Sequence, residues 1–266
     1  MSGHTLHRVI GGDVQADFDP HGRLMALSQS SGGHVFLAHP DTAASPWQLI
    51  VRDERGRSRT LTALDAHACH SERRYDGLIL SWSEIERAPG LNVTCTVQPG
   101  EDRLLWRLTV GGLTPNTALW RADFPVLDGL FSINDDDERL LLPRAGGYLI
   151  RHPSRALFAD PQASRRLSLA YPGGLTMQFI AYYRHRGDGL LLLAQDTAGY
   201  YKRPCAPFAA IGPTRRRATD RGPFGSRGAA AARSTPGKIS RTGCRKPVFG
   251  YGIAAGPSRC CPASAL

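Results

Sequence analysis

The chain has 266 residues and a formal net charge of +10, but this charge is unevenly distributed. Residues 1–202 hold 21 Lys and Arg against 22 Asp and Glu, a net charge of −1, whereas residues 203–266 hold 12 against 1, a net charge of +11. The composition therefore excludes a basic nucleic-acid-binding body, and no stretch approaches the roughly 18 apolar residues needed to span a bilayer.

The first ten residues, MSGHTLHRVI, lack the apolar region of a secretory signal. We therefore expect a cytoplasmic protein without a disulfide framework, although the chain has six cysteines. Four of these cysteines follow residue 202, and we expect the other two, Cys69 and Cys95, to be buried thiols.

Short strands separated by turns are predicted along the first 202 residues. Residues 23–29 and 34–38 flank Ser31-Gly32-Gly33, and residues 47–53 and 58–64 flank Glu54-Arg55-Gly56-Arg57. Asp-Gly pairs at 76–77 and 188–189 predict two further hairpin turns, because this pair readily adopts the positive φ angles of tight turns.

The clearest strand pattern covers residues 91–97 and 104–110. Apolar Leu91, Val93, Cys95 and Val97 alternate with polar residues, and after Pro99-Gly-Glu-Asp the alternation resumes through Trp106. Such alternation predicts a hairpin with one buried face. Since no segment of 12 or more residues has a bounded helical repeat, we predict one all-β domain over residues 1–202, an antiparallel β-supersandwich of about ten to fourteen strands.

Residues 203–266 differ in composition from the body. They hold one leucine, Leu266, but 8 Pro, 9 Gly and 12 Ala. So little branched apolar surface does not offset the entropy of ordering a chain, and we predict a disordered, basic tail rich in Pro, Gly and Ala.

Several segments of the body together resemble a known family. They are Asp19–Leu27 (DPHGRLMAL), Trp120–Leu127 (WRADFPVL), Leu142–Leu149 (LPRAGGYL), Tyr171–Tyr183 (YPGGLTMQFIAYY) and Gly189–Lys202 (GLLLLAQDTAGYYK). In this order they resemble the N-terminal β-supersandwich domain of a group of largely uncharacterised bacterial glycoside hydrolases.

The resemblance implies a galactose-mutarotase-like sandwich that precedes a catalytic (β/α)-barrel. Past Lys202 this chain has Arg-Pro-Cys-Ala-Pro where similar proteins continue into the barrel. The body holds 20 Arg and one Lys, as a GC-rich gene encodes, and a wrong reading frame of such a gene is rich in Arg, Pro, Ala, Gly, Ser and Cys. We therefore interpret residues 203–266 as out-of-frame translation that replaces the barrel.

Four residues are candidates for carbohydrate contact: Tyr171, Asp196, Tyr200 and Lys202. Tyr171 and Tyr200 lie near loops where an aromatic ring could stack on a sugar, although core packing is the simpler role for each. Asp196 follows an apolar strand and could face a sugar hydroxyl, with an Asx-type turn as the structural alternative. Lys202, the single lysine of the body, is otherwise a surface charge.

No catalytic, metal or cofactor site is expected in this chain. Hydrolysis of a glycoside needs two carboxyl groups facing each other across the bond, and the resemblance puts both on the barrel. The run Asp135-Asp136-Asp137-Glu138 has the character of a solvated loop and lacks the ligand spacing of a calcium loop. His67, Cys69 and His70 have no second cluster that would complete a zinc site.

The sequence therefore predicts the non-catalytic sandwich of a glycoside hydrolase-like protein, with carbohydrate as the possible partner. A free-standing carbohydrate-binding module is the alternative. Binding of nucleic acid through the basic tail is not expected, because Phe208, Phe224, Phe249 and Tyr251 are too widely spaced to stack successive bases. The sequence does not determine the oligomeric state or the glycan.

Overall fold

The computed structural model describes residues 6–31, 33–38, 45–128, 130, 133, 136–156, 166–168, 170–185, 187–196, 202–207, 229–234 and 248–257. These residues form nineteen strands, the 3-10 turn η1 (Ala63–Asp65) and the four-residue helix α1 (Pro153–Ala156). Every strand pair is antiparallel. The predicted all-β, antiparallel class is confirmed.

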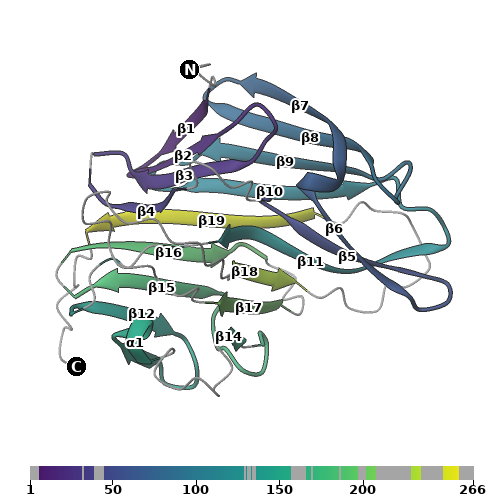
Figure 1. Cartoon of the computed structure of the whole chain (residues 1–266). Helices are drawn as coiled ribbons and strands as arrows, with labels where there is room; N and C mark the ends of the chain where they lie inside the picture. Colours follow the sequence, from purple (N-terminus) through teal and green to yellow (C-terminus); the bar gives the residue numbers. More distant parts are fainter. Residues whose placement is uncertain are drawn as a thin grey trace, which may run out of the picture.

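The largest layer is a nine-stranded sheet. Its strands are β7 (Ala66–Arg74), β8 (Gly77–Ile85), β9 (Asn92–Pro99), β10 (Leu104–Gly111), β12 (Glu138–Leu142), β13 (Tyr148–Arg151), β15 (Phe179–Arg184), β16 (Asp188–Ala194) and β19 (Val248–Pro257). They run in the order β13-β12-β15-β16-β19-β10-β9-β8-β7, so β19 lies in the middle of the sheet (Figure 1).

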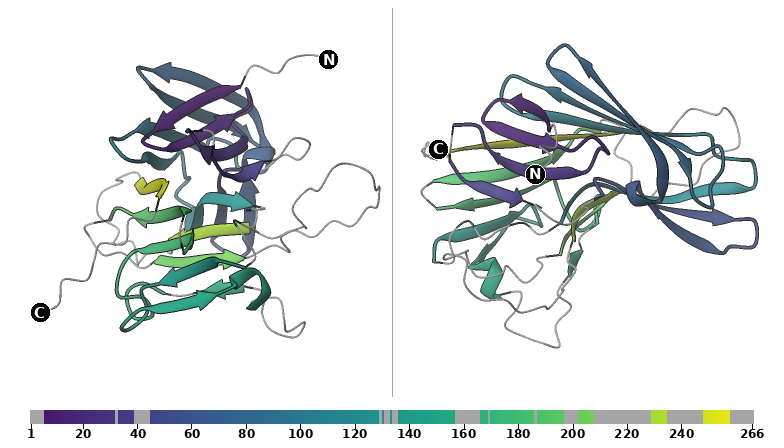
Figure 2. Two further views of the ribbon diagram at one scale, coloured as in Figure 1. Left: turned by 90° about the vertical axis from the view of Figure 1, so that its left-hand side faces the viewer. Right: turned by 45° about the horizontal axis from the view of Figure 1, so that its top comes forward.

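Two smaller sheets complete the sandwich. One contains β1 (His7–Gly11), β2 (Val14–Phe18), β3 (Leu24–Gln29) and β4 (Val35–Ala38), in that order. The other has the order β14-β17-β18-β11-β5-β6, and its strands are β5 (Gln48–Asp53), β6 (Ser58–Thr62), β11 (Thr117–Asp128), β14 (Arg166–Ser168), β17 (Lys202–Pro207) and β18 (Ala229–Ser234). Figure 2 shows these layers from two further sides.

Aromatic side chains join the three sheets into one core. The ring of Trp106 on β10 lies 5.3 Å from that of Phe18 on β2 and 6.3 Å from that of Phe124 on β11, measured between centroids. One face of the nine-stranded sheet therefore packs on both smaller sheets. Trp47 and Trp82 form a second, edge-to-face pair at 5.7 Å. Burial of Trp106 confirms its place on the buried face of the predicted hairpin, and Trp82 is buried as well.

The hairpin β9–β10 follows the predicted alternation. Val93, Cys95 and Val97 are buried, and Cys95 pairs with the buried Leu108 of β10. The predicted turns at 31–33 and 54–57 also separate paired strands, β3 from β4 and β5 from β6. Local alternation and turn residues thus predict these hairpins correctly.

Two predicted turns lie elsewhere than expected. The β7–β8 loop is Tyr75-Asp76, with Tyr75 at a φ of 52°, and Gly77 already belongs to β8. A Cβ on Gly77 would lie 2.9 Å from the carbonyl oxygen of Val97, so close backbone approach explains this glycine. Likewise Asp188 and Gly189 belong to β16, and Gly189 pairs with Tyr183 of β15.

The predicted strand number was too low. Residues 1–202 were expected to form about ten to fourteen strands, yet β1–β16 already lie within residues 7–194. Strand β7, whose sequence AHACHSERR has no clean alternation of apolar and polar residues, was indicated only by the turn that follows it. Hydrogen bonding to the neighbouring β8 places this polar edge strand in the sheet.

Three strands, β17, β18 and β19, contain residues of the predicted tail 203–266. β17 and β18 pair with each other, β18 also pairs with β11, and β19 pairs with β10 on one side and β16 on the other. In these segments the chain is paired in sheets, which corrects the expectation of a tail without structure there. The rest of residues 203–266 lies outside the described residues, and so does the prediction of its disorder.

A repeated five-residue turn shapes two of the hairpins. Asp19-Pro-His-Gly-Arg23 and Asp53-Glu-Arg-Gly-Arg57 share the pattern Asp-x-x-Gly-Arg. In each, the aspartate carboxylate accepts hydrogen bonds from two backbone N–H groups and pairs with the arginine four residues later. The glycines have φ angles of 72° and 73°, which explains their place in the pattern.

Candidate functional site

The structure describes only some of the predicted contact residues. Tyr171 is half-buried and packs against the core, which is the simpler of the two roles considered for it. Asp196 follows β16, and its backbone carbonyl accepts a hydrogen bond from the Gln178 side chain at 2.9 Å. Tyr200 lies outside the described residues, and of Lys202 the structure describes the backbone, which opens β17. The predicted sugar contacts of these four residues stay predictions.

The prediction that residues 135–138 form a solvated loop is wrong for Glu138. This residue opens β12, is fully buried, and accepts a hydrogen bond from the Tyr182 hydroxyl. The same hydroxyl accepts a hydrogen bond from the backbone N–H of Ile133 at 3.3 Å. Burial of a carboxylate needs such partners, and the sequence alone does not show that the neighbouring strand supplies one.

A cavity of about 330 Å³ lies at one end of the sandwich, and neither it nor its neighbour contains the four predicted residues. We call it the hairpin-end cavity. Three connections form it: the β5–β6 turn, the β8–β9 connection and the β10–β11 connection. It is lined by Val51, Asp53, Arg57, Arg59, Arg87, Ala88, Pro89, Leu91, Gly112, Leu113, Thr114, Asn116 and Thr117.

A second cavity of about 540 Å³ adjoins it. The two share Arg87, Pro89 and Leu91, and the second is also lined by Glu84 and Glu86. Glu84 and Arg87 both have left-handed backbones, with φ angles of 53° and 63°. Such conformations cost free energy in residues other than glycine, and they often mark functional sites.

The β8–β9 and β10–β11 connections touch through two glycines. A Cβ on Gly112 would lie 1.7 Å from the carbonyl oxygen of Gly90, far closer than any real contact. Gly112 also has a φ of 72°. Only glycine satisfies both conditions, so this pair holds the two connections together at the rim of the hairpin-end cavity.

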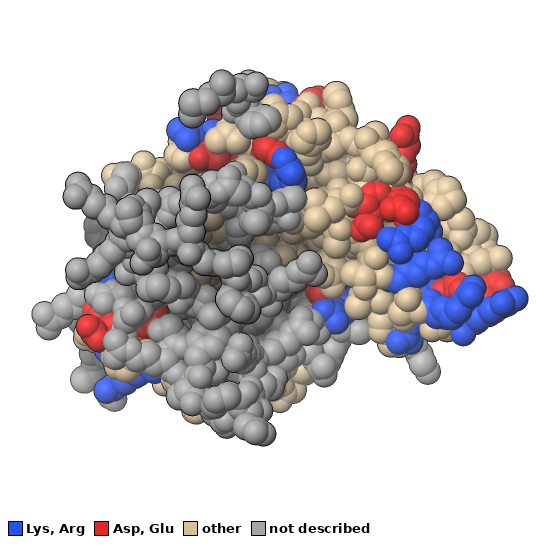
Figure 3. Space-filling model, in the orientation of Figure 1, with Lys and Arg blue, Asp and Glu red and all other residues tan. Residues whose placement is uncertain are grey.

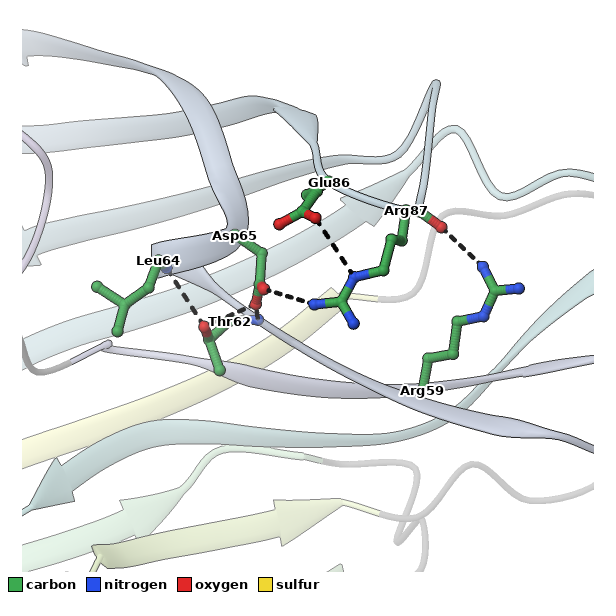
Figure 4. Close-up of polar contacts among 6 residues, drawn as sticks. All are labelled: Arg59, Thr62, Leu64, Asp65, Glu86 and Arg87. Carbon is green, nitrogen blue, oxygen red and sulfur yellow. Dashed lines mark hydrogen bonds and ion pairs between the residues drawn. The ribbon is translucent and has the colours of Figure 1, made fainter.

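A polar network fixes the arginine side of the cavity (Figure 4). The Asp65 carboxylate accepts hydrogen bonds from the backbone N–H and the hydroxyl of Thr62, at 2.7 and 2.8 Å, and pairs with Arg87 at 3.4 Å. Arg87 also lies 3.8 Å from Glu86. Arg59 on β6 donates a hydrogen bond to the backbone carbonyl of Arg87 at 3.0 Å. Residues 28 apart in sequence thus meet at one point.

Charges gather where the β5–β6 hairpin projects, at the right of Figure 3. Arg57 is paired with Asp53 at 2.7 Å. Desolvation alone raises the pKa of Asp53, but hydrogen bonds from the backbone and side chain of Arg57 outweigh it and lower the pKa below the usual value. Within the described part of the chain, Arg59 has no acidic partner.

The cavity combines an apolar floor with a polar rim. Val51, Leu91 and Leu113 supply apolar surface, and the arginines, Asn116 and two threonines supply hydrogen-bond groups. Its size and this mixture suit a small polar ligand with C–H faces, such as a sugar. Asp53, the one acid of this lining, is held by Arg57, so the hairpin-end cavity offers no pair of opposed carboxyl groups.

An exposed aromatic side chain lies on the other face of the same hairpin sheet. Trp120 is 46% exposed, and the Arg52 guanidinium lies 3.5 Å from the centre of its ring. The β5–β11 register shifts between Leu119 and Arg121, which leaves Trp120 without a cross-strand partner there. The bulge places the ring of Trp120 outward.

Sequence reasoning missed Arg59 and Arg87. The hairpin sequence Arg52-Asp-Glu-Arg-Gly-Arg-Ser-Arg59 is dense in arginine, which is a signal for an exposed basic turn. No feature of the local sequence indicates that this hairpin contacts the turn at Arg87, because that contact depends on the tertiary fold. Within the described residues, no group of three or more His, Cys, Asp or Glu could hold a metal ion, and no helix is long and apolar enough to cross a membrane.

No protein-family model and no curated protein sequence matches the chain. Solved structures do match its fold. An α-N-acetylgalactosaminidase from Bifidobacterium bifidum, solved in complex with GalNAc, has a TM-score of 0.60 and 14% identity, with 94% of this chain and 36% of that chain covered. This chain thus spans about a third of that enzyme's length.

Two further structures match with similar scores. A galactose mutarotase related enzyme from Lactobacillus acidophilus has a TM-score of 0.54 and 9% identity, over 95% of this chain and 97% of that chain. A GH36 α-galactosidase from Geobacillus stearothermophilus has a TM-score of 0.51 and 11% identity, over 95% and 41%. At these identities the likeness establishes a shared β-sandwich fold.

Proposed function

We propose that this chain is a non-catalytic, carbohydrate-binding β-supersandwich domain of a glycoside hydrolase-like protein. The observation that carries the proposal is the hairpin-end cavity, with its apolar floor and hydrogen-bonding rim, on a fold shared with sugar-processing enzymes. Sugars are bound by apolar surface against their C–H groups together with directed hydrogen bonds, and this cavity offers both.

The four buried carboxylates are held by other side chains, which argues against any of them as a catalytic acid or nucleophile. Asp17, Asp19 and Asp123 are each paired with an arginine, and Glu138 is bound by Tyr182 within the core. These contacts engage the carboxyl groups in structural bonds. A glycosidase needs two carboxyl groups free to face the substrate.

The test is a binding titration of the purified chain against a panel of mono- and oligosaccharides, with an assay for hydrolysis of aryl glycosides. We expect binding without turnover. Asn116→Trp should block the rim of the hairpin-end cavity and abolish binding, because Asn116 is exposed and lines it. Glu54→Trp is the matched control, since Glu54 is exposed in the β5–β6 turn but does not line the cavity. Turnover that disappears on mutation of one carboxylate would overturn the non-catalytic assignment.

The exposed Trp120 favours a second candidate, a free-standing carbohydrate-binding module that uses the outer face of the β5–β11 sheet. An aromatic ring there could stack on a sugar, with Arg52 beside it. Loss of saccharide binding in Trp120→Ala but not in Asn116→Trp would select this alternative over the cavity.

The switch of reading frame after residue 202 stays a prediction. The nucleotide sequence beyond codon 202, read in the other two frames, tests it: a barrel with strand-terminal carboxylates in one frame would support it. The pairing of β17, β18 and β19 within the sheets is the observation that counts against it.

A further inference from the structure

We propose that the hairpin-end cavity selects saccharides that carry an anionic group, a carboxylate or a sulfate, and that Arg59 binds this group. The inference rests on the proposed carbohydrate-binding function and deepens it by naming the class of saccharide that is bound. It follows from how the three arginines of the lining are paired.

Two of these arginines already have acidic partners. Arg57 pairs with Asp53 at 2.7 Å, and Arg87 pairs with Asp65 at 3.4 Å and approaches Glu86 at 3.8 Å. Arg59 has no acidic partner among the described residues, and its hydrogen bond goes to the neutral backbone carbonyl of Arg87. The uncompensated positive charge of the lining is therefore that of Arg59.

The geometry also leaves the guanidinium of Arg59 able to bind. Its Nη1 donates to the Arg87 carbonyl at 3.0 Å, which leaves the Nε and Nη2 side of the planar group for another acceptor. Two parallel N–H groups match the two oxygens of a carboxylate or sulfate.

The anchoring carbonyl is itself held in place. Arg87 lies in a turn in which the N–H of Ala88 donates to the carbonyl of Ile85 at 3.0 Å and the N–H of Leu91 to that of Ala88 at 3.1 Å. An anchored side chain loses less conformational entropy on binding than a free one. Arg59 is thus partly preorganised for an anion at the cavity wall.

The remaining lining fits the rest of such a ligand. Pro89, Leu91 and Leu113 offer apolar surface for a sugar ring, while Thr114 and Asn116 offer groups for its hydroxyls. A simple inorganic anion would use only the arginine. A sugar acid or sulfated sugar would use both parts of the cavity.

Calorimetric titration at low ionic strength tests the proposal with glucuronate, galacturonate and galactose 6-sulfate, their neutral parent sugars, and inorganic sulfate as probes. A charge-assisted hydrogen bond corresponds to about tenfold or more in affinity, so the anionic sugars should bind at least tenfold more tightly than the neutral ones. Arg59→Gln should remove this preference, and Arg59→Lys should restore only part of it, since lysine lacks the planar fork.

The matched control is Arg55→Gln, an exposed arginine of the same hairpin that does not line the cavity. It should keep the preference, and unchanged thermal unfolding of all variants should show intact folding. Equal losses in Arg55→Gln and Arg59→Gln would overturn the proposal in favour of general charge attraction. Equal binding of anionic and neutral sugars would overturn it while the proposed function stands. Binding of inorganic sulfate alone, or of no probe, would overturn both.

Discussion

Replacement of Gly112 by alanine should weaken both the fold and the candidate site. Gly112 has a φ of 72°, a conformation that costs an alanine roughly 1–2 kcal/mol. Its new Cβ would also lie 1.7 Å from the carbonyl oxygen of Gly90, so backbone must move, and such overpacking costs about 1–3 kcal/mol. The two effects together predict a loss of roughly 2–5 kcal/mol in the free energy of unfolding.

Two other glycines provide matched controls. Gly56 has a φ of 73° but nothing within 4 Å of an added Cβ, and Gly90 has a φ of 86° with its nearest neighbour 3.7 Å away. Gly56→Ala and Gly90→Ala should therefore lose only the conformational part, roughly 1–2 kcal/mol. The difference between Gly112→Ala and these controls isolates the steric contact between the two connections.

Urea denaturation followed by tryptophan fluorescence measures these values, with an unchanged m-value as the condition for comparing midpoints. Gly112→Ala should also weaken saccharide binding, because Gly112 lies in the lining of the hairpin-end cavity. A midpoint for Gly112→Ala within error of that for Gly56→Ala would refute the reasoning, since it would show that Gly90 and Gly112 do not touch.

Three further predictions concern the core and the C-terminal strands. Truncation after residue 247 removes β19 and leaves β10 and β16 with unpaired edges, so it should prevent cooperative folding. Truncation after residue 257 keeps β19 and should not prevent it. Circular dichroism melts compare the two chains, and a cooperative melt of the shorter one would contradict the pairing of β19. Tyr182→Phe removes the hydroxyl that donates to the buried Glu138 carboxylate, so it should lower the free energy of unfolding by about 1–3 kcal/mol. Urea denaturation measures this loss, and an unchanged stability would show that the two side chains are not hydrogen-bonded. Burial raises the pKa of Cys69 to about 11. Alkylation of the native protein at pH 8, followed by peptide mapping, should therefore label Cys69 slowly, and labelling should become rapid only after unfolding. Fast labelling of the native protein would refute the half-buried position of Cys69.

The candidate site was less predictable than the fold. The contact between Arg59 and Arg87 joins residues of two hairpins, and no spacing rule links them. Burial of Glu138 was missed because its neighbours in sequence are acidic, while its partner Tyr182 comes from β15. The outward position of Trp120 depends on a bulge in the β5–β11 pairing, which residue parity cannot reveal.

By itself the sequence determined the all-β class and several hairpins, including β9–β10 with its buried Val93 and Trp106. These features depend on residues close in the chain, where side-chain period and turn chemistry act directly. Only the tertiary structure decided that Val248–Pro257 pairs between β10 and β16, against the expectation from composition. The physical reason is that the edges of β10 and β16 offer backbone N–H and C=O groups, which bind a strand largely irrespective of its side chains.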